Sequence, residues 1–231
     1  MATHRERPPH ALQRAGLSRE RVLGAAVALA DEGGVEELSM RKLAKKLGVE
    51  AMSLYNHIAS KDRLLDGMVD VVFSEIEPPS PGADWKQEMR KRAISTRSAL
   101  NRHRWAVGLM EARPDPGEAN LRLHEAVLAC LRASGLSYEA AIHAYSVQDA
   151  YIYGFALQER ALALETSEEW VEAAERTLRD QQAALDAYPH IADIQHHLAA
   201  HGFSHEEEFL FGLDLILDAL EERLADGRRG R

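Results

Sequence analysis

Apolar residues recur along this chain at spacings of three and four, the period of an α-helix that buries one face. Leu64, Met68, Val72 and Ile76 form one such series, and similar series follow through most of the 231 residues. No extended stretch alternates polar and apolar residues, as a half-buried strand would. The pattern therefore predicts an all-α protein.

The first helices are expected over about 18–33, 39–47, 50–57 and 61–77, with Ser18, Ser39 and Ser60 as N-caps. Ala44, Gly48 and Leu54 have the spacing of a helix-turn-helix unit, in which they supply a close crossing, a left-handed turn and a buried anchor. The two inner helices have about two turns each and must pack on the first helix to be stable. The same spacing also occurs in helical proteins that bind no DNA.

The segment PPSPGADW, residues 78–85, contains three prolines and predicts a domain boundary. We therefore divide the chain into a disordered basic arm (1–17), a helix-turn-helix domain with its connecting helix (18–77) and a helical body (78–231). In the body we expect helices over about 84–102, 104–111, 117–134, 137–164, 167–186, 190–200 and 205–225.

The charge is divided unevenly. Residues 1–61 contain ten Lys or Arg and seven Asp or Glu, whereas the rest of the chain has 18 and 30, and the net charge is −9. A basic head on an acidic body indicates that the head meets a polyanion. The sequence has one cysteine, no signal-peptide pattern and no apolar run of about 18 residues, so we expect a cytoplasmic protein.

Residues 39–68, SMRKLAKKLGVEAMSLYNHIASKDRLLDGM, resemble the DNA-binding domain of the TetR family, including its L-Y-x-H pattern and following lysine. The stretches DWKQEMRKRAISTRSALNRHR and EEFLFGLDLILDALEERL resemble the body of that family more weakly. The resemblance implies a homodimer that binds double-stranded DNA at a palindromic operator and responds to a small effector in the body. It implies no catalysis and no cofactor.

The outward side of the third helix carries small, hydroxylic and amide side chains, which can reach base edges in a major groove. Together with the positions that the resemblance implies, the expected DNA contacts are Arg41, Lys42, Ala51, Met52, Ser53, Tyr55, Asn56, His57 and Lys61. Among these, Arg41 corresponds to a guanine-reading position of the family. Tyr55, His57 and Lys61 correspond to phosphate contacts.

The last helix is apolar on two faces, so one face can pack on a partner copy. The expected dimer contacts are Gly154, Phe209, Gly212, Leu213, Ile216 and Leu220. The resemblance also implies an effector site, lined by Glu77, Arg92, Thr96, Leu109, Ala112, Val127 and Gln158, to which the nearby Trp105, Gln148 and Tyr151 are added for their residue type. Leu109 and Ala112 stand where tetracycline-binding members have a metal-binding His and a Thr. We therefore expect a hydrophobic or aromatic effector other than magnesium–tetracycline, with Arg92, Gln148 or Asp149 as a polar anchor.

The interpretation that follows is a ligand-responsive transcriptional repressor, and two alternatives stay open. One keeps the DNA-binding fold but makes the protein an activator or a binder without an effector. The other is a small all-α metalloenzyme that uses histidines between residues 190 and 205, because His197 and His201 have the i, i+4 spacing of metal ligands. Cys130 has no neighbouring base in the sequence and is expected to be a buried, inert thiol.

Overall fold

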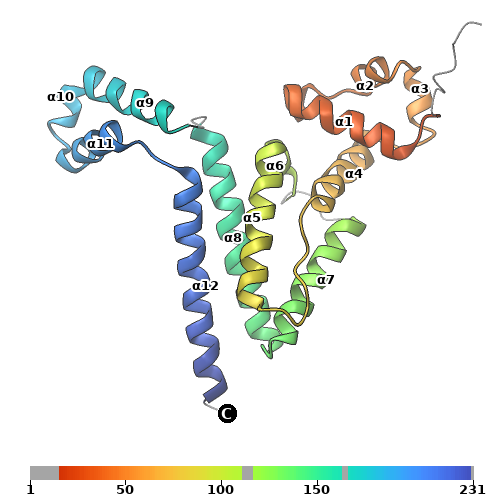
Figure 1. Ribbon diagram of the computed structural model, residues 1–231. Coiled ribbons are helices and arrows are strands. Elements are labelled where there is room, and N and C mark those ends of the chain that lie inside the picture. Colours follow the sequence, from red (N-terminus) through yellow and green to blue (C-terminus); the bar gives the residue numbers. More distant parts are fainter. Residues whose placement is uncertain (1–15, 111–116, 163–165, 230–231) are drawn as a thin grey trace, which may run out of the picture. The chain divides into compact units, whose positions relative to one another are not determined.

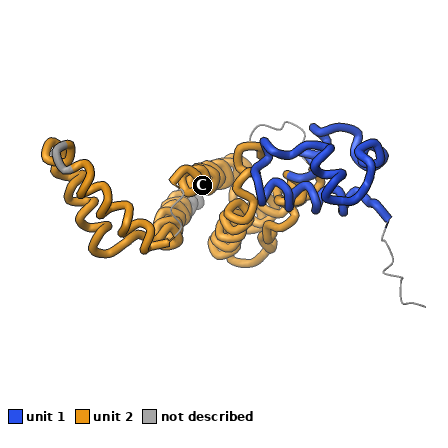
Figure 2. The backbone as a smooth tube through the Cα atoms, turned by 90° about the horizontal axis from the view of Figure 1, so that it is seen from above, with its two compact units in different colours: residues 1–68 blue, residues 69–231 orange. Residues whose placement is uncertain are grey.

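The computed structural model describes residues 16–110, 117–162 and 166–229, and the expected arm lies almost wholly outside this part of the chain (Figure 1). Within the described residues the secondary structure is helical and contains no strand, so the predicted all-α class is confirmed. The chain divides into two compact units, residues 1–68 and 69–231 (Figure 2). The division falls inside helix α4, Lys61–Ser74.

The first unit contains α1 (Arg19–Gly33), a short 3-10 turn (Val35–Glu37), α2 (Met40–Leu47), α3 (Ala51–Leu54) and the start of α4. Its core includes Val22, Ala26, Leu38, Leu43, Ala44, Leu54, Ile58 and Leu64. The short 3-10 turn, α2 and α3 therefore share one small core with α1 and the start of α4.

The expected caps of the first unit are present. The hydroxyl of Ser18 accepts a hydrogen bond from Arg21 N, and that of Ser39 accepts one from Lys42 N, at 3.3 and 3.2 Å. Gly48 has φ 68° and ψ 34°, and its N–H donates to the carbonyls that end α2. Because a side chain strains this left-handed conformation, glycine suits the turn into α3.

The third helix is shorter than predicted. The sequence indicates helix over residues 50–57, but α3 covers Ala51–Leu54, and a turn continues to residue 57. The tighter turn is visible in the hydrogen bonds, because Ser53 N, Tyr55 N and His57 N all donate to the carbonyl three residues earlier. Such tight turns expose side chains differently from a regular α-helix.

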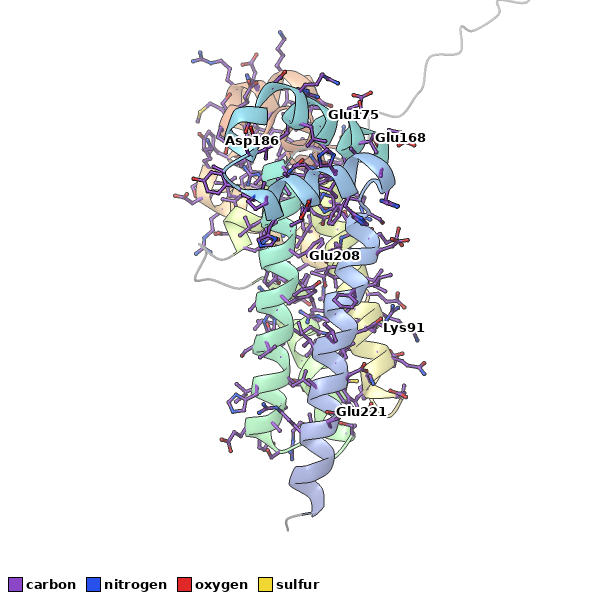
Figure 3. All side chains as sticks on the ribbon, turned by 90° about the vertical axis from the view of Figure 1, so that its left-hand side faces the viewer. Lys91, Glu168, Glu175, Asp186, Glu208 and Glu221 are labelled. Carbon is purple, nitrogen blue, oxygen red and sulfur yellow. The ribbon has the colours of Figure 1, made fainter. Side chains whose placement is uncertain are left out.

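The second unit is built on long helices. These are α5 (Trp85–Arg102), α7 (Glu118–Ala133), α8 (Tyr138–Leu162) and α12 (His205–Arg229), with the short α6 (Ala106–Met110). Figure 3 shows α8 and α12 running side by side, and α5 packs on both. Their shared core includes Met89, Leu131, Ile152, Phe209, Leu213 and Leu217. None of the helices in the described ranges is both long and apolar enough to span a membrane.

A helical hairpin separates α8 from α12. It consists of α9 (Ser167–Asp180), α10 (Gln182–Leu185) and α11 (Pro189–His201), and α9 packs along α11. Thr166 and Glu169 form the predicted capping box at its start. The single helix predicted over 167–186 is wrong, since Gln181 ends α9 with ψ 21° and a new short helix follows.

Candidate DNA-contacting surface and effector cavity

The surface of α3 follows from one buried anchor. Leu54 is fully buried, which turns its neighbours outward: Met52 is 75% exposed and Tyr55 is 43% exposed. Asn56 is also exposed, while Ala51, Ser53 and His57 are half-buried. The structure therefore presents a small surface of apolar, hydroxyl and amide groups, which is the set of side chains that can contact base edges.

Cations lie on the elements next to α3. Arg41 and Lys42 are exposed in the first turn of α2, and Lys61 is exposed in the first turn of α4. The ammonium of Lys42 lies 2.8 Å from a Glu37 carboxylate oxygen and lowers the pKa of that carboxyl. An ion pair this exposed contributes little free energy, so Lys42 can exchange it for a phosphate.

Three residues expected to contact an effector instead form a polar core between α5 and α8. Arg92 is 2% exposed; its Nη1 donates to Gln148 Oε1 at 3.1 Å, and its Nη2 lies 2.6 Å from Asp149 Oδ1. Gln148 donates in turn to Met89 O, and Thr96 Oγ1 donates to Arg92 O. Arg92, Thr96 and Gln148 are thus engaged within the protein, and their contact with an effector stays a prediction.

The other expected effector contacts are dispersed. Trp105 and Val127 are buried in the core, Leu109 is half-buried, and Gln158 and Glu77 are exposed; Ala112 lies outside the described residues. The Tyr151 hydroxyl donates to Phe209 O at 3.0 Å, and its ring stacks on that of Phe209. Tyr151 therefore joins α8 to α12. The structure does not gather these residues into one site.

A cavity of about 500 Å³ lies beside this polar core, between α4, α6, α7 and α8. Its lining residues are Phe73, Met110, Asn120, His124, Tyr145, Ser146, Asp149, Ala150, Tyr153 and Leu157. Aromatic walls with a few convergent polar groups are typical of small-molecule sites, and the volume falls in their usual range. Asp149 is one of the polar anchors that the sequence analysis proposed, and Met110 lies next to the expected position Leu109.

Hydrogen bonds connect the polar wall of this cavity. The Tyr145 hydroxyl contacts His124 Nε2, and His124 Nδ1 lies 2.9 Å from Asn120 O. A carbonyl can only accept, so Nδ1 is the donor there, and Nε2 is left to accept a hydrogen bond from the Tyr145 hydroxyl. Burial and the nearby Asp149 carboxylate raise the pKa of Tyr145, which keeps the phenol protonated.

Two other cavities are less suited to an effector. One of about 420 Å³ is lined by Arg97, Glu159, His205 and neighbours, but Arg97 and Glu159 already neutralise each other through two hydrogen bonds. The other, of about 670 Å³, is an apolar groove between residues 73–81 and the start of α7. Two of its charged lining residues, Glu118 and Arg122, pair with each other.

The part of α4 that belongs to the second unit is held there at one point within the helix and at another just after it. Asp70 Oδ1 accepts hydrogen bonds from Ala119 N at 2.9 Å and Asn120 N at 3.1 Å, and so caps α7 from another helix. Gly117, the N-cap residue of α7, has no capping side chain, and a Cβ there would overlap the Asp70 carboxylate. Asp70 is a residue that the sequence analysis missed, because nothing in the local pattern distinguishes it from a solvated carboxylate.

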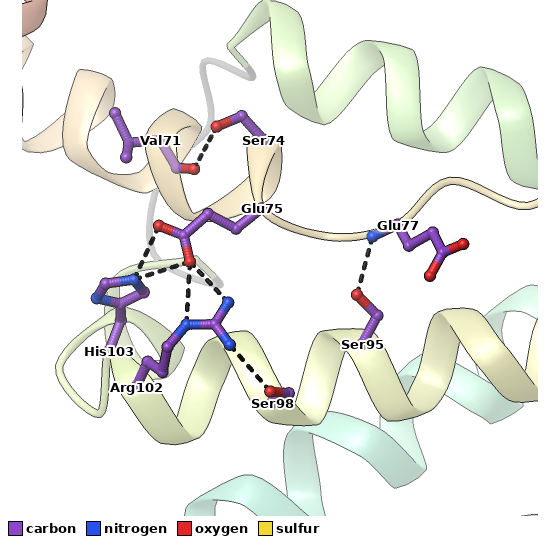
Figure 4. Close-up of polar contacts among 8 residues, drawn as sticks. All are labelled: Val71, Ser74, Glu75, Glu77, Ser95, Ser98, Arg102 and His103. Atoms are coloured by element: carbon purple, nitrogen blue, oxygen red, sulfur yellow. Dashed lines mark hydrogen bonds and ion pairs between the residues drawn. The ribbon is translucent and has the colours of Figure 1, made fainter.

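The second attachment is at Glu75, just after α4 (Figure 4). Arg102 donates to Glu75 Oε2 through Nε and Nη2 at 3.2 and 2.7 Å, and His103 Nε2 lies 3.1 Å from both carboxylate oxygens. Burial opposes ionisation, but the Arg102 and His103 hydrogen bonds outweigh it and lower the pKa of Glu75. Nearby, Glu77 N donates to Ser95 Oγ. The end of α4 is therefore fixed to α5.

The apolar face of α12 that remains exposed differs from the predicted one. Phe209 and Leu213 are fully buried against the chain's own α5 and α8, so their assignment to a dimer contact is wrong. Gly212 makes room for the Tyr151 ring of the same chain. Ile216 and Leu220 are half-buried at the edge. The exposed residues are Phe211, at 63%, and Leu215, at 56%, two and six positions after Phe209.

Exposed apolar residues on α8 complete this surface. Val147 is large and about half exposed, and Gly154 is exposed with open space where a Cβ would lie. We define the α8–α12 face as Val147, Gly154, Phe211 and Leu215. An apolar surface on two adjoining helices is a candidate protein contact.

The late histidines do not converge. His197 and His201 stack on each other, and His201 Nδ1 lies 3.0 Å from His197 O. His205 instead packs against Trp170 and Phe203 at the base of the hairpin. In the part of the chain that the structure describes, no three His, Cys, Asp or Glu residues surround a possible metal position. The i, i+4 spacing is thus used for ring stacking.

Comparison with known proteins identifies the family. Residues 22–68 match the family model of bacterial regulatory proteins of the tetR family, and residues 78–224 match that of the tetracyclin repressor-like C-terminal domain. The chain belongs to the TetR family of bacterial regulators. It is 34% identical over 223 residues to the HTH-type transcriptional repressor DrrR1 of Streptomyces coeruleorubidus, which covers 93% of this chain and 80% of the relative.

Further relatives agree. The class D tetracycline repressor protein of Escherichia coli is 33% identical over 150 residues, covering 63% of this chain and 68% of the repressor. The structure of ActR from Streptomyces coelicolor in complex with actinorhodin superposes with a TM-score of 0.72 at 25% identity, covering 91% of this chain and 99% of that one. TetR-family membership makes the protein a DNA-binding transcriptional regulator and not an enzyme, which decides against the metalloenzyme alternative.

Proposed function

We propose that this TetR-family regulator is a homodimeric repressor of a palindromic operator, released when a small molecule binds the cavity between α4, α6, α7 and α8. The observation that carries the proposal is the placement of α4. Its first residue, Lys61, stands beside the α3 surface in sequence, and Phe73, near its end, lines the cavity. One helix therefore has a residue in each candidate site.

The DNA contacts proposed are those of the exposed α3 surface, with Arg41, Lys42 and Lys61 as the cations. Met52 and Tyr55 are the exposed large side chains of this surface, and both are proposed to contact bases or backbone. The exposed Lys61 ammonium adjoins the N-terminal turn of α4, where backbone N–H groups also favour a phosphate. The relative DrrR1 is named a repressor, which supports repression over activation.

Dimerisation is proposed through the α8–α12 face. Two copies related by a twofold axis would bury the patch that contains Phe211 and Leu215 against the same patch of the other copy, because a twofold contact is self-complementary. Gly154 lies exposed within the face, where an approaching helix gains from the missing side chain. Two heads are needed because each α3 reads one half-site.

The cavity supports effector binding because it borders the helix that must move. Phe73 belongs to α4, while Asn120 belongs to the α7 turn that Asp70 of α4 caps. A ligand that fits a different arrangement of these helices binds one state better and shifts the population. By linkage, DNA and effector must then weaken each other's binding by the same factor.

The test is selection of bound sequences from random DNA, followed by titration of the best site. Tyr55→Ala and Lys61→Ala are each expected to reduce operator affinity at least about tenfold, and Lys61→Ala should lower the salt slope by about one. Lys91→Ala removes the same charge from α5 and should change neither. Operator affinity unchanged by both head substitutions would contradict the assignment of the DNA surface.

A further inference from the structure

The start of α3 is apolar. Its first two residues, Ala51 and Met52, carry no side-chain hydrogen-bond donor, and a thioether is at most a weak acceptor. Met52 is 75% exposed, more than any other large apolar side chain in the described part of the chain. It lies two residues before the buried Leu54, which is about 200° around a helix, so Met52 faces away from the core of its unit. Apolar surface of this kind gains free energy when a partner covers it.

The charges around Met52 indicate that this partner is DNA. Residues 39–61 contain five Lys or Arg and a single Asp or Glu. Arg41 and Lys61 are both exposed, one on the helix before α3 and one on the helix after it. A second copy of this basic surface would be repelled, whereas a DNA groove is bordered by phosphates on both sides. An apolar side chain with cations on the neighbouring helices therefore suits the floor of a groove.

The chemistry of Ala51 and Met52 restricts which base they can recognise. In the major groove, guanine, adenine and cytosine are distinguished by hydrogen-bond donors and acceptors, and neither side chain can bond to these groups effectively. The apolar group that a base presents in this groove is the C5 methyl of thymine. A donor or acceptor of another base placed against Met52 would lose its water without gaining a partner, which is unfavourable. The start of α3 therefore favours thymine.

Resting on the proposed DNA-binding function, we propose that Met52 is a specificity-determining residue whose side chain packs on the C5 methyl group of one thymine in each half-site. Arg41 and Asn56 remain the side chains that read bases by hydrogen bonds, and Met52 reads by burying a methyl group. The methyl group is recognised and not the hydrogen-bonding edge of the base. A 5-methylcytosine, which carries the same group at the same ring position, therefore substitutes for the thymine.

Removal of single methyl groups from the DNA tests the proposal. The operator obtained by selection is remade with deoxyuridine in place of each thymine in turn, at symmetric positions of both half-sites. Loss of one buried methyl group should weaken binding about fourfold, so the two half-sites together give about fifteenfold. This loss is expected at one thymine position, and deoxyuridine outside the half-sites is the control. Equal affinity for all the deoxyuridine duplexes would overturn the proposal.

A second pair of duplexes separates the methyl group from the shape of an A·T pair. At the sensitive position, thymine is replaced by cytosine or by 5-methylcytosine, each paired with guanine. The two duplexes share the same hydrogen-bonding edge and differ in the methyl group. The methylated duplex should bind about fifteenfold more tightly. Equal binding of the two would show that the thymine preference comes from other features of the base pair, and it would refute recognition of the methyl group.

Substitutions of Met52 assign the effect to this residue. Met52→Ala should weaken operator binding about as much as deoxyuridine does, and its further response to deoxyuridine should be less than about twofold, because both changes remove one contact. Met52→Leu keeps an apolar side chain of similar volume and should keep the response, whereas Met52→Gln, of similar length, should lose it. Because Met52 is exposed, thermal melting of all three variants should change little. A full deoxyuridine response in Met52→Ala, or an equal loss of affinity for unrelated DNA, would contradict the assignment.

The proposed function has a separate readout. Operator binding by the wild-type chain, and its loss in Tyr55→Ala and Lys61→Ala, test the DNA surface without any modified base. Intact operator binding with no response to the thymine methyl groups refutes only the role of Met52. Failure of the wild-type chain to bind any selected sequence refutes the proposed DNA surface, and the role of Met52 with it.

Discussion

The substitution Asp70→Ala tests the connection between α4 and α7. It removes the oxygen that accepts from Ala119 N and Asn120 N at 2.9 and 3.1 Å, at a helix start where Gly117 supplies no cap of its own. Loss of an N-cap costs about 0.5–2 kcal/mol, and hydrogen bonds to a charged group contribute about 1.5–3 kcal/mol each. Since these terms describe the same contacts and overlap, we expect destabilisation of about 2–3 kcal/mol.

The assay is thermal unfolding followed by circular dichroism. For a chain of this length, the expected loss corresponds to a fall in Tm of roughly 4–12 °C. Asp70→Asn keeps an acceptor oxygen and should lose about 1 kcal/mol, because asparagine caps nearly as well as aspartate. Glu118→Ala is the matched control: it removes an exposed charge from the same helix start and should cost less than about 1 kcal/mol. Equal effects of Asp70→Ala and Glu118→Ala would refute the reasoning.

Three further predictions concern the α8–α12 face, an exposed glycine and Glu75. Phe211→Asp should convert the dimer to a monomer in analytical ultracentrifugation, whereas Leu121→Asp, at a similarly exposed position on α7, should not; a dimeric Phe211→Asp would exclude this face. Gly154→Ala should weaken dimerisation although an isolated helix gains about 1 kcal/mol from it, and a tighter dimer would contradict close approach. Because the folded-state pKa of Glu75 is lowered, its stabilisation is present above the ordinary value of 4.5 and is lost as pH falls through the folded value. The difference in free energy of unfolding between the wild-type chain and Glu75→Gln, measured by urea unfolding, should therefore become smaller as the pH falls through the folded-state pKa of Glu75. A difference that becomes larger would contradict the ion pair.

The sequence was most informative where one local rule acts alone. The serine caps, the left-handed Gly48 and the buried Leu54 follow from residue type and spacing, and the structure contains all of them. The α3 end was mispredicted because Tyr55 and Asn56 fit a helix as well as a turn. Their actual conformation depends on the tertiary packing of Leu54 and Ile58.

The cavity was harder to predict because it depends on which of the buried polar residues also face the cavity. Arg92, Gln148 and Asp149 are all buried, yet only Asp149 also reaches the cavity. Similarly, Phe209 and Phe211 are the same residue type in the same helix, so residue type does not distinguish them. Only the packing against α5 and α8 shows that Phe209 is internal. Residue type indicates that such groups are special, but the orientation of the helices decides their role.

The central claim is that two copies of the chain place their two helix-turn-helix domains on one twofold-symmetric DNA site. Binding stoichiometry on DNA tests it most directly. Full-length protein is titrated onto three duplexes: a selected palindrome, a single half-site, and the palindrome with about half a helical turn of DNA inserted between its halves. The account predicts two chains on the intact palindrome and at least about hundredfold weaker binding to both altered duplexes. One chain per duplex, with equal affinity for all three, would contradict it.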